Sequence, residues 1–179
     1  MIKYFKQDQK KVVFCVKKIL CILFILVLCL CSCQKQSENN YRNDVLTKDI
    51  ASEILEKTKL TLLTKSDEGW VASTVPIDID LCEEFEFYMD STNKADLMGI
   101  FKAKGETEAE TVFEQSKKYL EKLETNWLSE YSPEELPKIQ NAFCERYGNY
   151  VVFFVFDEDS KNIASNTAEE MVTLYVAVN

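Results

Sequence analysis

The chain has 179 residues, a length that suits one domain of ordinary size. Its formal net charge of −9 combines two unlike regions. Residues 1–32 hold six lysines and one aspartate, whereas the remainder holds 15 basic and 29 acidic residues, a charge of −14. A domain this acidic repels phosphate backbones, so we exclude nucleic acid as a partner. Histidine is absent, which removes the usual metal ligand and the usual general base.

The N-terminal residues have the pattern of an export signal. Six lysines within residues 3–18 precede an unbroken apolar run at residues 19–31. A helix needs about 20 apolar residues to span a bilayer, so this run is too short for a permanent span and fits the core of a signal peptide. We therefore expect residues 1–32 to be a signal peptide.

The apolar run ends in Leu30-Cys31-Ser32-Cys33. This tetrapeptide resembles the lipobox of bacterial lipoproteins, in which an aliphatic residue and two small residues precede the cysteine that is lipidated. The resemblance implies a lipid anchor on Cys33 at the outer face of the cytoplasmic membrane, and residues 33–45 then form anchor and flexible tether. Two acyl chains hold a protein stably at a membrane where one does not. A secreted protein without lipid, or an uncleaved N-terminal anchor, remains an alternative.

Residues 46–179 are expected to form a single α+β domain. An amphipathic pattern predicts a first helix at about 47–59, and the lack of periodicity in 60–82 predicts an irregular segment. Alternating apolar and polar residues predict a half-buried strand at 84–90. A second strand at 95–103 would pair with it as a hairpin.

The clearest predicted element is a long helix in the middle of the domain. Thr107 and Glu110 form a capping box, and an apolar stripe at helical spacing continues to Trp127. A second hairpin is predicted at 139–147 and 150–156, where the later strand is apolar on both faces and should be covered on both sides.

The end of the chain allows two interpretations. Thr167 and Glu170 form another capping box, which predicts a helix from about residue 168, whereas residues 171–178 could instead form a closing strand. The complete pattern predicts an antiparallel sheet of about four strands in two hairpins. A long central helix and flanking helices would pack against that sheet.

Three segments carry a family resemblance: ADLMGIFKAK at 95–104, YSPEE at 131–135 and YGNYV at 147–151. In this order and spacing they resemble the domain-of-unknown-function family numbered 4358, small lipoproteins of low-GC Gram-positive bacteria. The resemblance covers roughly residues 47–175. Family members often carry an acidic residue where this chain has Leu97, which weakens any role for that position. The resemblance implies a location and a fold, and no activity.

Carboxylates and cysteines are the remaining candidates for chemistry. The acidic clusters at 78–84 and 157–159 lack the glycine of a calcium loop, and we interpret them as solvated loops. Cys33, Cys82 and Cys144 are too few for a structural zinc site. Outside the cell Cys82 and Cys144 could form a disulfide, although we favour buried free thiols. We assign no catalytic residue, metal ligand or cofactor.

These observations favour a non-catalytic module of the cell envelope, attached to the membrane and binding a protein, a peptide or a wall component. Its acidic surface should prefer cationic partners. One alternative is a carboxylate-dependent cell-wall enzyme, which would need two carboxylates that converge in a concave pocket. Another is the substrate-binding lipoprotein of a transporter, for which one domain of this size is small.

Overall fold

A computed structural model of the chain describes residues 41–92, 94–127, 130 and 132–174. The predicted signal peptide and Cys33 lie outside the described residues. Within the described part of the chain, none of the helices has both the length and the apolar character needed to cross a bilayer.

The described residues form five α-helices and five strands, with two short 3-10 helices between them. The strands make one antiparallel sheet in the order β1-β2-β3-β5-β4. This is the predicted α+β class, with a long helix and two hairpins. In chain order the elements are α2 (Thr47–Thr58), β1 (Leu63–Lys65), α3 (Glu68–Thr74), η1 (Ile79–Leu81), β2 (Cys82–Asp90), β3 (Leu97–Ala103), α4 (Glu106–Asn126), η2 (Pro133–Glu135), α5 (Leu136–Gln140), β4 (Phe143–Tyr147), β5 (Tyr150–Val155) and α6 (Glu158–Val172).

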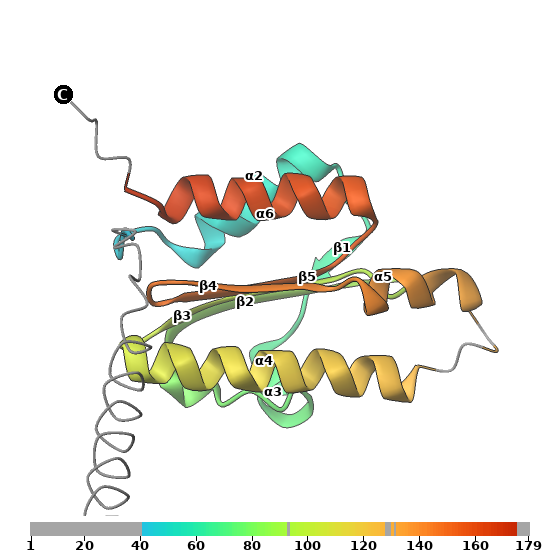
Figure 1. The fold of residues 1–179 in the computed structure, drawn as a ribbon, viewed down its shortest axis with the longest axis horizontal. Coiled ribbons are helices and arrows are strands. Elements are labelled where there is room, and N and C mark those ends of the chain that lie inside the picture. The colour runs from blue at the N-terminus through green and yellow to red at the C-terminus, as the bar shows by residue number, and fades with distance from the viewer. Residues whose placement is uncertain (1–40, 93, 128–129, 131, 175–179) are drawn as a thin grey trace, which may run out of the picture. The chain divides into compact units, whose positions relative to one another are not determined.

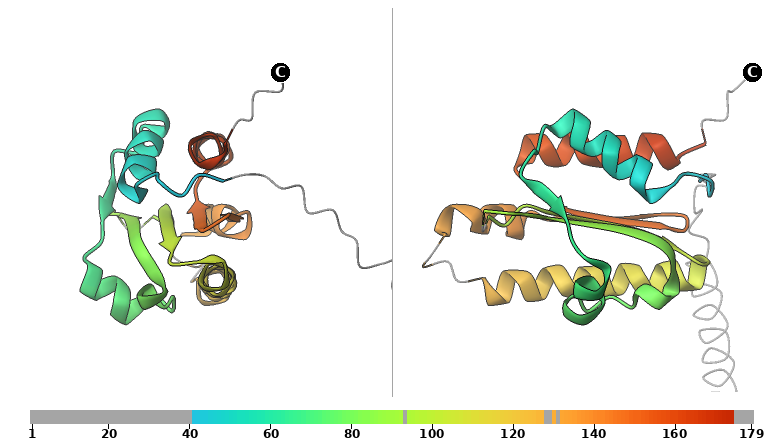
Figure 2. Two further views of the ribbon diagram at one scale, coloured as in Figure 1. Left: turned by 90° about the vertical axis from the view of Figure 1, so that its left-hand side faces the viewer. Right: turned by 180° about the vertical axis from the view of Figure 1, so that it is seen from behind.

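Helices cover both faces of the sheet, α3 and α4 on one face and α2 and α6 on the other (Figures 1 and 2). On the α4 face, the ring of Phe153 packs 6.0 Å from Phe87 and 5.8 Å from Phe101 between ring centroids. On the opposite face, Ile50 and Ile54 are fully buried. All six residues of β5 are buried, which explains why its sequence shows no alternation.

The first described residues are fixed to the end of the sheet that carries the β4–β5 turn. Tyr41 pairs with Thr173 in an isolated antiparallel bridge. The Tyr150 hydroxyl donates to the Val45 carbonyl at 2.7 Å and accepts from its N–H at 3.1 Å. Gly148 forms the turn with a φ of +61°, and a Cβ at this position would lie 2.9 Å from the Cβ of Tyr41. The folded chain therefore begins beside this turn.

The segment 60–82, predicted to be irregular, contains β1, α3 and η1. The Asp67 carboxylate caps α3, because it accepts a hydrogen bond from the Trp70 N–H at 3.1 Å. β1 has three residues and α3 has seven, too few for either to show a clear period in the sequence. The sheet thus gains an edge strand beyond the two predicted hairpins.

The last helix begins at Glu158, ten residues before the predicted start. The Asp157 carboxylate caps it by accepting hydrogen bonds from the Ser160 N–H at 3.0 Å and the Ser160 hydroxyl at 2.8 Å. Helix α6 then continues to Val172, so the positions offered for a closing strand are helical up to that residue. Thr173 pairs only in the isolated bridge with Tyr41, Leu174 has no regular structure, and positions 175–179 lie outside the described residues.

Two other boundaries differ from the prediction. Helix α4 begins at Glu106 with Gly105 as its N-cap, one residue before the predicted capping box. Strand β4 begins at Phe143 and not at the predicted residue 139, because Ile139 belongs to α5, where it is buried. Proline in the first turn of η2 and of α5 favours helical geometry there, since its φ angle is already helical.

Candidate functional site

The predicted lipidation site, Cys33, lies outside the described residues, so the structure bears on the folded domain alone. A cluster of buried charged side chains lies at the end of the sheet opposite the β4–β5 turn.

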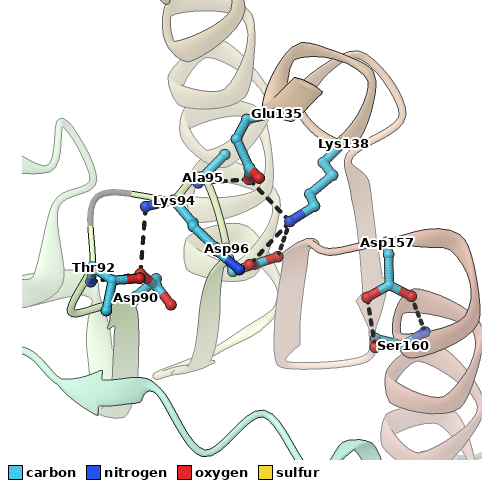
Figure 3. Close-up of polar contacts among 9 residues, drawn as sticks. All are labelled: Asp90, Thr92, Lys94, Ala95, Asp96, Glu135, Lys138, Asp157 and Ser160. Atoms are coloured by element: carbon cyan, nitrogen blue, oxygen red, sulfur yellow. Dashed lines mark hydrogen bonds and ion pairs between the residues drawn. The ribbon is translucent and has the colours of Figure 1, made fainter. Parts of the chain in front are cut away.

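Lys138 joins two buried carboxylates at this end (Figure 3). Its Nζ lies 3.1 Å from both carboxylate oxygens of Asp96 and 2.9 Å from Oε2 of Glu135. The same Glu135 oxygen accepts the Ala95 N–H at 3.0 Å. The side chains of Asp96, Glu135 and Lys138 are 10%, 7% and 20% exposed. We call these three residues the ion cluster; it fastens the start of β3 to η2 and α5.

The members of the ion cluster respond differently to burial. Burial raises the pKa of Asp96, even though the Lys138 ammonium acts against it. Burial acts the same way on Glu135, but the hydrogen bonds from Lys138 and Ala95 outweigh it and lower the pKa of that carboxyl. For Lys138, burial is outweighed by the two carboxylates, and its pKa is raised. Lys138 and Glu135 therefore stay charged at neutral pH.

A pocket of about 140 Å³ adjoins the ion cluster. Asp90 and Asp96 both line it, so two carboxylates reach one hollow. The Asp90 carboxylate accepts hydrogen bonds from the Thr92 N–H at 2.6 Å and the Lys94 N–H at 3.3 Å, which outweigh its burial and lower its pKa. Asp90 thus closes its own turn while Asp96 binds Lys138. The other lining residues are Lys59, Leu60, Thr61, Leu62, Leu63 and Lys94.

Carboxylates of both acidic clusters have structural partners. Glu84 accepts hydrogen bonds from the Thr47 N–H at 3.2 Å and hydroxyl at 3.0 Å, and so satisfies the first turn of α2. Lys102 lies 3.7 Å from the same carboxylate. Glu84 lies partly buried in β2, so the interpretation as a solvated loop is wrong for that residue, whereas Asp157 is exposed ahead of α6 and its carboxylate caps that helix. No group of three or more cysteine, aspartate or glutamate side chains in the described part of the chain could hold a metal ion.

Cys82 and Cys144 are free thiols, as favoured from the sequence. β3 and β5 lie between their strands, a separation of three strand spacings or about 14 Å. A disulfide requires Cα atoms within about 7 Å, so these two cysteines cannot pair. Burial raises the pKa of each thiol to about 12. Both are therefore protonated at neutral pH and are poor nucleophiles.

Residues 56–156 match the family model described as a domain of unknown function, DUF4358. The chain belongs to this family. The match spans all five strands together with α3, α4, α5 and the last residues of α2. The resemblance drawn from three short segments is confirmed. Neither the curated proteins nor the solved structures contain a match to this chain.

The sequence did not single out the ion cluster, although Asp96 and Glu135 stand within the segments that carried the DUF4358 resemblance. Asp96 and Lys138 are 42 residues apart. Nothing in their local sequence distinguishes them from the many exposed charges of this chain. Their burial follows from the packing of α5 against the end of the sheet.

Proposed function

We propose that this DUF4358 protein is an extracytoplasmic lipoprotein of the cell envelope, and that its domain is a non-catalytic binding or interaction module. The observation that carries this proposal is the order of features at the N-terminus. Lysines come first, an apolar run too short to span a bilayer follows, and the lipobox-like residues ending at Cys33 come directly after.

The spacing between Cys33 and the fold agrees with a short tether. The described fold begins at Tyr41, and the seven residues 34–40 stand between. A fully extended chain over this distance reaches at most about 28 Å. If lipid on Cys33 holds the chain, the start of the domain at Tyr41 would therefore lie within that distance of the membrane surface.

The chemistry of the domain supports binding over catalysis. Asp96 and Glu135 are committed to Lys138, and both thiols are protonated at neutral pH. Each of these groups stabilises the fold in the arrangement described. A binding module needs only a stable sheet that presents a surface.

Metabolic labelling with an alkyne fatty acid tests the anchor. The full chain, expressed in a Gram-positive host, should carry the label and fractionate with membranes. Cys33→Ala should abolish the label and leave an unprocessed or released protein. Cys31→Ala is the matched control: it keeps a small residue at its place and should leave labelling unchanged. Label that survives in Cys33→Ala, or is lost in Cys31→Ala, would refute the assignment.

A carboxylate-dependent enzyme is the second candidate, because Asp90 and Asp96 line one pocket and their pKa values shift in opposite directions. Incubation of the protein with purified cell wall separates the two functions. Release of soluble fragments that disappears in Asp96→Asn, with the fold retained, would support the enzyme. Absence of release from the wild-type protein would support the binding module.

A further inference from the structure

The outer edge of β2 is only partly occupied by β1. β1 pairs with residues 88–90, and the Ser66 N–H then donates to the Phe87 carbonyl at 2.8 Å. Beyond Ser66 the chain leaves the sheet and crosses to α3 (Figure 2). Since β2 has nine residues and β1 has three, the first half of β2 extends past its edge partner.

The register shows which backbone groups face this open edge. The Asp90 N–H donates to the Asp96 carbonyl, so Asp90 and alternate residues before it direct their backbone groups toward β3. Phe85 belongs to the other set and directs its N–H and C=O outward. Neither group has a hydrogen-bond partner among the residues that the structure describes.

The open edge borders a groove of about 400 Å³, larger than the pocket of about 140 Å³ beside the ion cluster. The chain between β1 and α3 forms one wall, and η1 with the first residues of β2 forms the other. We call this hollow the edge groove. It is lined by Lys65, Ser66, Glu68, Ile79, Asp80, Cys82, Glu83, Glu84, Phe85 and Lys104.

The charges of the edge groove favour a cation. Four carboxylates and two lysines line it, and the lysines already have partners. Lys65 lies 2.8 Å from the Glu86 carboxylate, and Lys104 donates to the Asp80 carbonyl at 2.7 Å. The carboxylates of Glu68 and Asp80 have no ion-pair partner among the described residues. A basic side chain that enters the groove therefore meets a net negative field.

We propose that the edge groove binds an extended, lysine- or arginine-rich segment of another protein, which adds as a further strand to the outer edge of β2. The unpaired N–H and C=O of Phe85 offer the hydrogen bonds at which the added strand pairs, as in other domains that bind peptides by strand addition. The groove carboxylates select basic side chains at alternate positions. This inference rests on the proposed binding module and gives it a ligand class.

A labelled heptapeptide of alternating lysine and valine, added to the full chain in detergent, tests the proposal. The peptide should bind and slow hydrogen exchange at the Phe85 amide at least tenfold. A version N-methylated at alternate amides, and one with glutamate in place of lysine, should each bind at least tenfold more weakly. Equal binding of the methylated peptide, or binding without protection at Phe85, would overturn strand addition. No detectable binding would overturn the proposal as a whole.

Charge reversal locates the site. Glu68→Lys should weaken binding at least fivefold, whereas Glu170→Lys on α6 makes the same charge change across the sheet and should leave binding unchanged. If both variants weaken binding equally, the effect reflects net charge alone and the proposed site is overturned. The site is also overturned if the protein forms a dimer that the peptide does not dissociate. If the chain binds the peptide but carries no lipid on Cys33, only the proposed anchor is refuted. If the chain is lipidated but does not bind the peptide, only the proposed role of the edge groove is refuted.

Discussion

Replacing Lys138 by methionine tests whether the ion cluster depends on its single cation. Methionine keeps an unbranched side chain, one atom shorter than that of lysine, and removes the charge and three hydrogen bonds. Two adjacent carboxylates, 10% and 7% exposed, would then lie buried without a counter-ion. Removal of one partner from a buried pair typically costs about 3–5 kcal/mol.

Proton uptake limits this cost and makes it depend on pH. A carboxyl with an ordinary pKa near 4 can be protonated at pH 7 for about 4 kcal/mol, and at pH 5 for about 1.5 kcal/mol. Without Lys138 both carboxyls have a raised pKa in the folded state, so the fold gains stability as pH falls toward their unfolded values. We expect Lys138→Met to lower the free energy of unfolding by about 2–4 kcal/mol at pH 7 and by about 1–2 kcal/mol at pH 5.

Urea denaturation of residues 34–179, followed by circular dichroism at both pH values, measures the effect. Lys57→Met is the control, because Lys57 pairs with Glu53 on the surface of α2, where both side chains are more than 40% exposed. Such a pair contributes about 0.3–0.5 kcal/mol. A cost for Lys138→Met no larger than that of Lys57→Met, or one identical at pH 5 and pH 7, would refute the electrostatic account.

Three further substitutions test the packing, the helix cap and the chain start in the same assay. Gly99→Ala would place a Cβ against the Phe153 ring, and should cost about 1–3 kcal/mol through overpacking; an unchanged midpoint would contradict this contact. Asp157→Ala should cost about 1 kcal/mol at pH 7. The hydrogen bond from the Ser160 N–H lowers the pKa of Asp157 in the folded state. The contribution of Asp157 to stability is therefore complete above pH 4 and is lost as the pH falls through the lowered pKa, so the free energies of unfolding of the variant and the wild type should then converge. Tyr150→Phe should cost about 1–3 kcal/mol, because two backbone groups ahead of α2 lose their buried partner.

Long periodic elements could be predicted from the sequence. The apolar stripe of α4, the alternation in β2 and the unbroken apolar run of β5 each cover enough residues to fix an element and its buried face. β1 and α3 could not be predicted in this way, because a strand of three residues has no measurable alternation. The start of α6 was missed although Asp157 offered a cap, since a second capping pattern further along gave a competing start.

The charged contacts could not be predicted, because they join residues far apart in the chain. Helix α2 has Leu46 at its N-cap position, and its first turn is satisfied by Glu84 on β2. No local pattern signals a cap supplied from 37 residues away. The edge groove likewise depends on where β1 leaves β2, which depends on tertiary packing.

The distance between Cys82 and Cys144 has a consequence for how the domain matures. An exported domain that relied on a disulfide would need an oxidant and an isomerase after secretion. This sheet holds its two thiols apart on β2 and β4, so reducing agents leave its covalent structure unchanged. Folding of residues 41–174 therefore requires no disulfide between these two cysteines.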